Sequence, residues 1–152
     1  MGESFYAPDL AVGVKVTVQD LPATVTGVVH YTLDQDTSWS SYQLQSGRDV
    51  FWLTVVDEST GPETVRWASA PLPPGELGDA TLEHDGRVYL HQDGGTARYR
   101  TEGDVDLPRE GVSQWHDYLV GDRRLSVERF DGGPWEASVG EVVPIGDLVV
   151  GR

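Results

Sequence analysis

The chain alternates between apolar and polar residues along most of its length. In the segment VGVKVTVQD every second residue from Val12 to Val18 is a valine, so the valines share one face of an extended strand. The segments FWLTVV and RLSVERF have the same period and are rich in β-branched and aromatic residues, which favour strands. No stretch of ten or more residues has the apolar spacing of an amphipathic helix. The pattern therefore predicts an all-β protein.

Turn-forming residues divide these strands into two groups. The Asp85-Gly86 pair lies between polar and apolar flanks and predicts a two-residue hairpin. The segment SAPLPPGELGD, residues 69–79, is rich in proline and glycine and reads as a linker. The length of 152 residues fits one domain. We therefore expect a single domain over residues 1–152, built from halves near residues 10–68 and 80–150.

Short motifs recur in the same order in both halves. The matches, first half before second, are Trp39-x-x-Tyr42-x-Leu44 with Trp115-x-x-Tyr118-x-Val120, Leu53-Thr54-Val55 with Leu125-Ser126-Val127, Gly61-Pro62 with Gly133-Pro134, and Gly27 and Tyr31 with Gly95 and Tyr99. Recurrence at similar spacing indicates an internal repeat. The sequence thus predicts two pseudo-equivalent antiparallel meanders that pack as a sandwich or as a closed barrel.

The repeated motifs also predict which residues are buried. We expect a core of Tyr42, Leu44, Leu53, Val55, Tyr118, Val120, Leu125 and Val127. Trp39 and Trp115 each lie three residues before a core tyrosine. In a regular strand, side chains three residues apart point to opposite faces. This position implies either a bulge or a place on the loop that enters the strand, where the ring would cap the core.

Tryptophan residues are the candidate binding residues. If Leu53 and Val55 point inward, Trp52 points outward, and the matching position in the second half is Arg124. An outward tryptophan either lies beneath a loop or marks a contact surface, where tryptophan is enriched. We therefore assign binding roles to Trp52, Trp39 and Trp115, against the alternative that their role is purely structural.

The charge balance restricts the class of partner. The chain has 25 acidic and 11 basic residues, a net charge of −14. Such a surface repels nucleic acid and anionic membranes, so we expect neither as a partner. It suits a cationic partner or a small cation, although an acidic surplus also serves solubility alone. The N-terminal segment lacks the pattern of a secretory signal and no apolar run could span a membrane, so we expect a cytoplasmic protein without membrane insertion.

No motif of a known catalytic or metal site is present. The single lysine, Lys15, does not follow a phosphate-binding glycine loop, and there is no Gly-x-Ser-x-Gly motif. The chain has no cysteine. His84 and His91 flank the predicted hairpin, but their spacing matches no standard zinc pattern, and we interpret them as solvated. We therefore assign no catalytic residue, metal ligand or cofactor.

The order of the strand segments resembles a known family. It runs LAVGVKVTV, TVTGVVHY, WSSYQL, FWLTV, HDGRVYL, WHDYLV and RLSVERF. Over most of residues 10–150 this order resembles the bacterial domain of unknown function family 4178. In that family the Trp-x-x-Tyr element usually carries acidic residues between the aromatic residues. Ser40-Ser41 depart from this pattern, and His116-Asp117 match it in part.

The family has no established activity, so the resemblance supplies no catalytic residues. It implies an accessory role in envelope stress or polyamine-related physiology. We predict a non-enzymatic interaction module that binds a protein partner in a bacterial membrane-linked or stress-related system. The alternative is a small enzyme or ligand-binding protein with an acidic cleft between the halves, for a cation such as a polyamine. A cleft lined by two or more carboxylates, one of them with a perturbed pKa, would favour the alternative.

Overall fold

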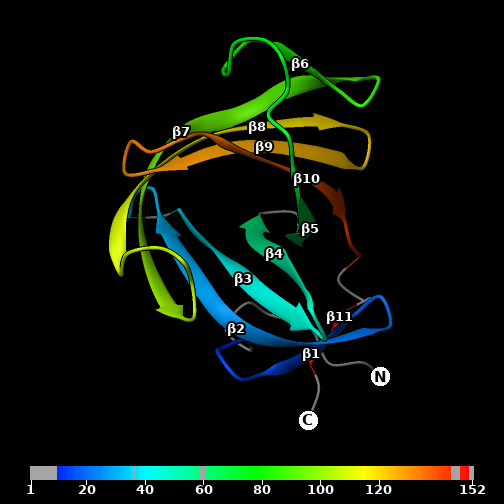
Figure 1. Cartoon of the computed structure of the whole chain (residues 1–152), viewed down its shortest axis with the longest axis vertical. Helices are drawn as coiled ribbons and strands as arrows, with labels where there is room; N and C mark the ends of the chain where they lie inside the picture. Colours follow the sequence, from blue (N-terminus) through cyan, green and yellow to red (C-terminus); the bar gives the residue numbers. More distant parts are fainter. Residues whose placement is uncertain (1–9, 36, 59–60, 145–147, 151–152) are drawn as a thin grey trace.

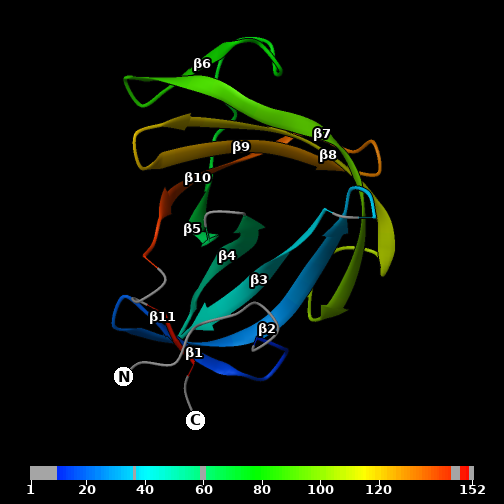
Figure 2. The same cartoon turned by 180° about the vertical axis from the view of Figure 1, so that it is seen from behind.

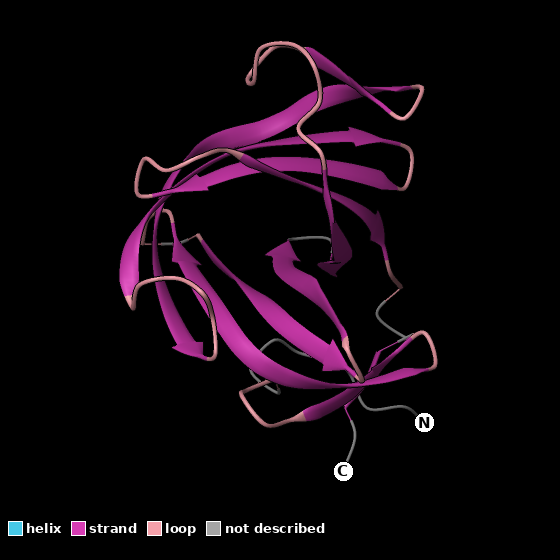
Figure 3. Cartoon of the chain, viewed as in Figure 1, coloured by secondary structure: helices cyan, strands magenta, loops and turns pink. Residues whose placement is uncertain are grey.

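The computed structural model describes residues 10–35, 37–58, 61–144 and 148–150. All regular elements of this part are strands, as predicted (Figure 3). They are β1 (Lys15–Val18), β2 (Leu21–Thr32), β3 (Ser38–Ser46), β4 (Asp49–Glu58), β5 (Gly61–Ala70), β6 (Thr81–His84), β7 (Arg87–Gly103), β8 (Glu110–Val120), β9 (Arg123–Phe130), β10 (Glu136–Val142) and β11 (Leu148–Val150). Within these residues no helix has the length and hydropathy needed to cross a membrane.

Eight of the strands form a closed antiparallel barrel. Neighbours follow in the order β2-β3-β4-β5-β10-β9-β8-β7, and β7 pairs with β2 to complete the ring. Figures 1 and 2 show β2 and β3 on one side of the barrel and β7, β8 and β9 on the other. The additional strands β1 and β11 continue the sheet from one half of β2, and β6 continues it from one half of β7. Of the two predicted packings, the chain adopts the barrel.

Two glycines allow β2 and β7 to meet. Gly27 lies opposite Gly103 in the register, next to a bulge in β2. Gly103 has a φ of +79°, and a Cβ atom there would lie 2.5 Å from the carbonyl oxygen of Thr26. A residue with a side chain would therefore be strained by its backbone conformation and would also clash.

The apolar core lies on the outer face of the barrel wall, beneath the additional strands. Seven of the predicted core residues are buried, and Val120 is partly buried. One cluster packs the outer face of β2, β3 and β4 against β1, Leu10, Val143 and Leu148. A second cluster packs the outer face of β8 and β9 against Leu82 of β6 and Leu77. The outer face is buried because the covering segments shield it from water.

The predicted explanations for Trp39 and Trp115 were wrong. Both residues lie within regularly paired strands, and the register shifts occur elsewhere, at Val25/Gly27 and His91/Asp93. No bulge is needed for the tryptophans to point away from the apolar core, because the opposite face of these strands is the barrel interior. The hairpin prediction was correct: Asp85 and Gly86 connect β6 to β7 with φ values of 52° and 75°.

Candidate functional site

The barrel encloses a cavity of about 630 Å³. Residues from β2, β3, β4, β5, β8, β9 and β10 line it. Most of the strand residues that line it share one face of the continuous sheet: Gln43 pairs with Trp52, Trp52 with Trp67, and Trp115 with Glu128. In a closed barrel, a face shared by so many strands is the interior. Exposed side chains of Leu72, Asp106 and Glu136 mark where the cavity opens.

All five tryptophans of the chain line this cavity. Trp39 stacks on Tyr31 with ring centroids 5.1 Å apart and an interplanar angle of 9°, and its ring meets Trp115 edge to face at 5.2 Å. We call Tyr31, Trp39 and Trp115 the aromatic cluster. Tyr31 and Trp115 are buried. The cluster therefore forms a dense apolar end to the cavity, with ring geometries that are favourable for aromatic pairs.

The wall formed by β3, β4 and β5 combines tryptophans with hydroxyl groups. Trp52 and Trp67 are cross-strand neighbours. The indole Nε1 of Trp67 donates a hydrogen bond to Thr54 Oγ1 at 3.0 Å, and Thr54 Oγ1 lies 2.8 Å from Ser41 Oγ. These polar atoms thus have partners within the wall, which leaves the indole rings as its main recognition surface.

Glu128 is the most strongly perturbed acid of the cavity. Ser113 Oγ donates a hydrogen bond to Glu128 Oε2 at 2.5 Å, and the Tyr31 hydroxyl also bonds this carboxyl group. Burial raises the pKa of Glu128 to about 7, against the opposing effect of these two hydrogen bonds; the charges of Asp117 and Glu136 raise it further. Burial and then Glu128 raise the pKa of Tyr31, so the phenol remains protonated and able to donate.

Two more carboxylates lie next to Glu128 on the interior face. Glu136 of β10 is directly opposite it in the register. Asp117 of β8 is a diagonal neighbour, because Asp117 pairs with Ser126, two residues before Glu128. Ser126 Oγ donates to Asp117 Oδ1 at 2.7 Å. Among the described residues that line the cavity there is no lysine, arginine or histidine, so the ionisable carboxyl groups of this wall are acidic and no basic residue belongs to the lining.

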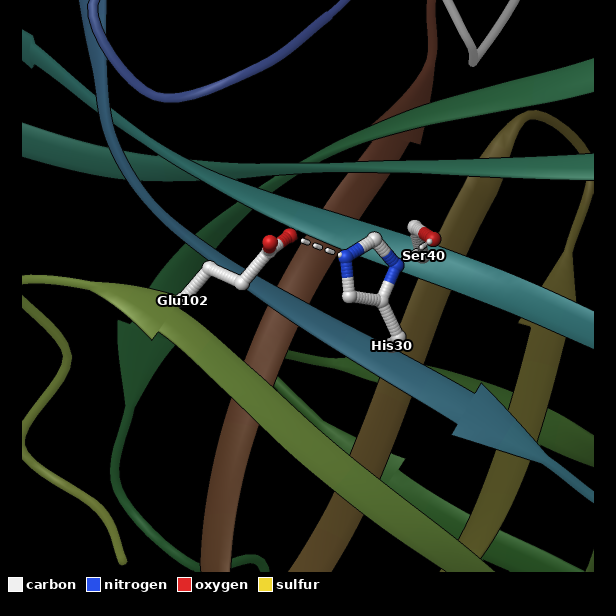
Figure 4. Close-up of polar contacts among 3 residues, drawn as sticks. All are labelled: His30, Ser40 and Glu102. Carbon is white, nitrogen blue, oxygen red and sulfur yellow. Dashed lines mark hydrogen bonds and ion pairs between the residues drawn. The ribbon is translucent and has the colours of Figure 1, made fainter. Parts of the chain in front are cut away.

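A second polar group lies outside the barrel. Figure 4 shows His30 between Ser40 and Glu102. His30 Nδ1 is 2.9 Å from Ser40 Oγ, and Nε2 is 2.6 Å from Glu102 Oε2. The His30 contact lowers the pKa of Glu102. Ser40 lies within β3 and pairs with His30 and Val55 on its two sides, so its backbone is part of the sheet. The order serine, histidine, acid is that of hydrolases. Because Ser40 is paired on both sides within the sheet, we interpret the group as a link between β2, β3 and β7.

The histidines flanking the hairpin do not meet. His84 contacts Tyr89, whereas His91 is exposed and its Nε2 lies 3.1 Å from Nδ1 of His116. Burial and the charge of His91 lower the pKa of His116. In the described part of the chain, no three histidine or acidic side chains converge as metal ligands would.

Of the predicted binding residues, Trp39, Trp52 and Trp115 lie around the same cavity. The outward orientation predicted for Trp52 was wrong, because its face of β4 is the barrel interior. Glu128 and Ser113 were missed, since polar residues that alternate with apolar ones resemble a solvent-facing surface. One signal could have revealed them: in several strands, tryptophans lie on the same face as the polar residues, and a purely solvent-facing surface would not be expected to carry so many.

Comparison with known proteins places the whole barrel in one family. No match to the chain was found among curated proteins or among solved structures. The sequence profile described as "Domain of unknown function (DUF4178)" matches residues 11–145, a range that includes every strand of the closed barrel. The chain therefore belongs to the DUF4178 family, as the order of its strand segments predicts.

Proposed function

We propose that the protein binds a small organic cation inside its barrel. The observation that carries this proposal is the composition of the cavity lining. It contains all five tryptophans and four carboxylic acids, Asp106, Asp117, Glu128 and Glu136, and no basic residue among those described. The proposal corresponds to the ligand-binding alternative predicted from the sequence, with the site inside the barrel rather than in a cleft between packed halves.

The residues that line the cavity favour a ligand that is positively charged and has an apolar body. Indole rings attract cations through the negative potential of their faces, and this attraction is strongest where water is excluded. The carboxylates add direct attraction for a cation and repel anions. The tryptophan surface meanwhile suits an apolar or aromatic body. A molecule with one cationic group and an apolar body satisfies both parts of the lining, and a flexible polyamine is a second member of the same class.

The size of the cavity agrees with such a ligand. A volume of about 630 Å³ lies within the range of roughly 300–1,000 Å³ that is usual for small-molecule sites. Eight-stranded barrels are wide enough to hold one small ligand. The binding of a protein partner and the cytoplasmic location expected from the sequence stay predictions.

We also infer that the barrel consists of two pseudo-equivalent halves. Strands β1 to β5 and β6 to β10 follow the same neighbour order, and the halves join through β2–β7 and β5–β10. Tyr31 lies opposite Tyr99 in the first of these junctions. Antiparallel pairing of corresponding strands is what a two-fold relation between repeats would produce.

Tryptophan fluorescence and thermal shift together test the proposed function. The probes are phenethylamine, tetramethylammonium and spermidine, with 2-phenylethanol and phenylacetate as the neutral and anionic comparisons, all at matched ionic strength. We expect the cations to change the emission and to raise the melting temperature; at a hundred times its Kd a ligand stabilises by about 2.7 kcal/mol. Equal effects from the neutral or anionic compounds would contradict the proposal.

A positive charge introduced into the cavity tests the site, and the same charge introduced elsewhere is the matched control. Trp52→Arg places a guanidinium group in the cavity lining, so it should abolish binding of the cationic probes. Val88→Arg adds the same charge at an exposed position outside the lining and should leave binding unchanged. Circular dichroism checks that both variants retain the parent fold. Weakening of binding in both variants to the same extent would show that the overall charge, and not the cavity, attracts the probes.

A further inference from the structure

We propose that the ligand is a primary or secondary amine whose ammonium group binds the Glu128 carboxyl beside the aromatic cluster and displaces the proton that Glu128 carries in the empty cavity. This inference rests on the proposed function, because it names the group of the ligand that enters the cavity and the protein group that receives it. It also makes binding dependent on pH.

The position of Glu128 relative to the aromatic rings is the first support. Glu128 pairs across the strands with Trp115, and its carboxyl group bonds the hydroxyl of Tyr31. Ser113, which is fully buried, donates a second hydrogen bond to this carboxyl group. Two hydroxyl donors therefore fix the acid next to two rings of the aromatic cluster. An ammonium group at this point contacts a carboxylate and aromatic faces together, and both attract a cation.

The surrounding charges are the second support. The titratable groups that face Glu128 are Asp117 on β8, Glu136 on β10 and Tyr31 on β2. Arg129, next in sequence, lies on the opposite face of β9, where its Nε donates to Gln114 Oε1 at 2.6 Å and its guanidinium carbon lies 5.0 Å from the centroid of the Trp135 ring. An ionised Glu128 would thus lie beside two further acids with no cation among the described lining residues. The proton on Glu128 relieves this repulsion.

This arrangement makes cation binding a one-for-one exchange. The ligand enters as R-NH₃⁺, the O–H bond of the Glu128 carboxylic acid breaks, and the proton passes to solvent. The resulting carboxylate accepts hydrogen bonds from the ammonium N–H groups, from Ser113 and from Tyr31. The charge of the cavity is the same before and after the exchange. A quaternary ammonium ion has no N–H group to donate, so it lacks the hydrogen bonds of an amine at this position.

Titration calorimetry with phenethylamine tests the exchange. The number of protons released is obtained by repeating the titration in buffers with different enthalpies of ionisation. We expect close to one proton released per ligand at about pH 5.5 and none at about pH 8.5, and affinity that rises about tenfold from pH 5.5 to 6.5 before it levels off above about pH 7. N,N,N-trimethylphenethylammonium, which keeps the phenyl group but has no N–H group to donate, should bind at least about tenfold more weakly than phenethylamine.

Two variants locate the proton. Glu128→Gln removes the titrating group, so proton release and the pH dependence of affinity should both disappear. Glu136→Gln removes a neighbouring acid that is exposed, and it should keep the proton release. The Ser113 bond can persist in Glu128→Gln, because the amide oxygen also accepts a hydrogen bond.

The possible outcomes separate this inference from the proposed function. If no cationic probe binds at any pH, the proposed function is wrong. If phenethylamine binds without proton release, or if Glu128→Gln releases the same number of protons as the parent, the cavity binds cations but the exchange at Glu128 is wrong. If N,N,N-trimethylphenethylammonium binds as tightly as phenethylamine, the assignment of an N–H-donating head group is wrong.

Discussion

Glu128 illustrates, at the level of a single residue, how the cavity reduces the stability of the fold. Its partly accessible side chain lines the cavity, next to Asp117 and Glu136 and without a basic partner in the described lining. An acid whose pKa is raised in the folded protein opposes folding once the pH is high enough to ionise it. Unfavourable groups of this kind are characteristic of sites shaped by function rather than by stability.

Replacing Glu128 with glutamine should therefore stabilise the empty protein at alkaline pH. The folded state holds the proton up to a pKa of about 7, whereas the ordinary value is 4.5, so the parent loses stability as the pH rises between these values. Over this interval the loss amounts to about 3 kcal/mol. The variant should match the parent near pH 4 and exceed it above pH 8, as measured by urea unfolding. A variant that is less stable than the parent at both pH values would contradict the assigned pKa.

The sequence indicated which residues alternate, but not the environment of each face. The Trp-x-x-Tyr motif correctly predicted that Tyr42 and Tyr118 are buried and that the paired tryptophans face the other side. It could not show that this other side is enclosed, because a two-residue period is the same for a solvated face and for the interior of a barrel. Ser113 and Glu128 were unrecognisable for the same reason.

At the level of elements, the strands and the β6–β7 hairpin were predictable because each depends on neighbouring residues. The bulges at Val25/Gly27 and His91/Asp93 were not predicted. A bulge depends on how a strand passes from one neighbour to another, and β2 and β7 each change partner along their length. Such long-range pairing has no local sequence signal apart from glycine at the close contact.

Replacing Gly103 with alanine should open the junction between β2 and β7. The new Cβ would lie 2.5 Å from the carbonyl oxygen of Thr26, in addition to the strain of a positive φ. Gly86 is the matched control, because its φ of +75° is similar and nothing lies within 4 Å of a Cβ there. We expect Gly86→Ala to cost about 1 kcal/mol and Gly103→Ala to cost at least about 2 kcal/mol more. Equal losses in chemical unfolding would show that the close approach is unimportant.

At the level of the whole molecule, the predicted sandwich and the predicted barrel differ only in whether the sheet closes into a ring. Both use the same meanders, and they differ in whether β7 pairs with β2. That pairing joins residues far apart in sequence, such as Gly27 and Gly103. The net charge of −14 was readable from the sequence, but the concentration of acids along one wall of the cavity became visible only in the fold.

The overall charge should make stability depend on salt. Unscreened repulsion among the acidic residues opposes the compact state, and salt at about 0.1 M screens charges beyond about 10 Å. We expect the melting temperature to rise as sodium chloride increases from about 10 mM to about 300 mM. Sucrose at equal osmolality is the control for effects that do not depend on charge. A melting temperature that falls with salt would mean that attractive ion pairs dominate the surface.

The pairing of β1 with β11 has a mechanical consequence. Lys15, where β1 begins, and Val150, where β11 ends, lie at the same end of an antiparallel ladder. A force that pulls these two points apart acts on the hydrogen bonds one after another, because the bonds run perpendicular to the strands. The hydrogen bonds between β1 and β11 would therefore break one at a time. They would not share the load, as they would if the strands were pulled along their length. Under tension the molecule should thus lose the cover of one apolar cluster at low force, while the eight-stranded ring beneath, joined by longer ladders, yields later.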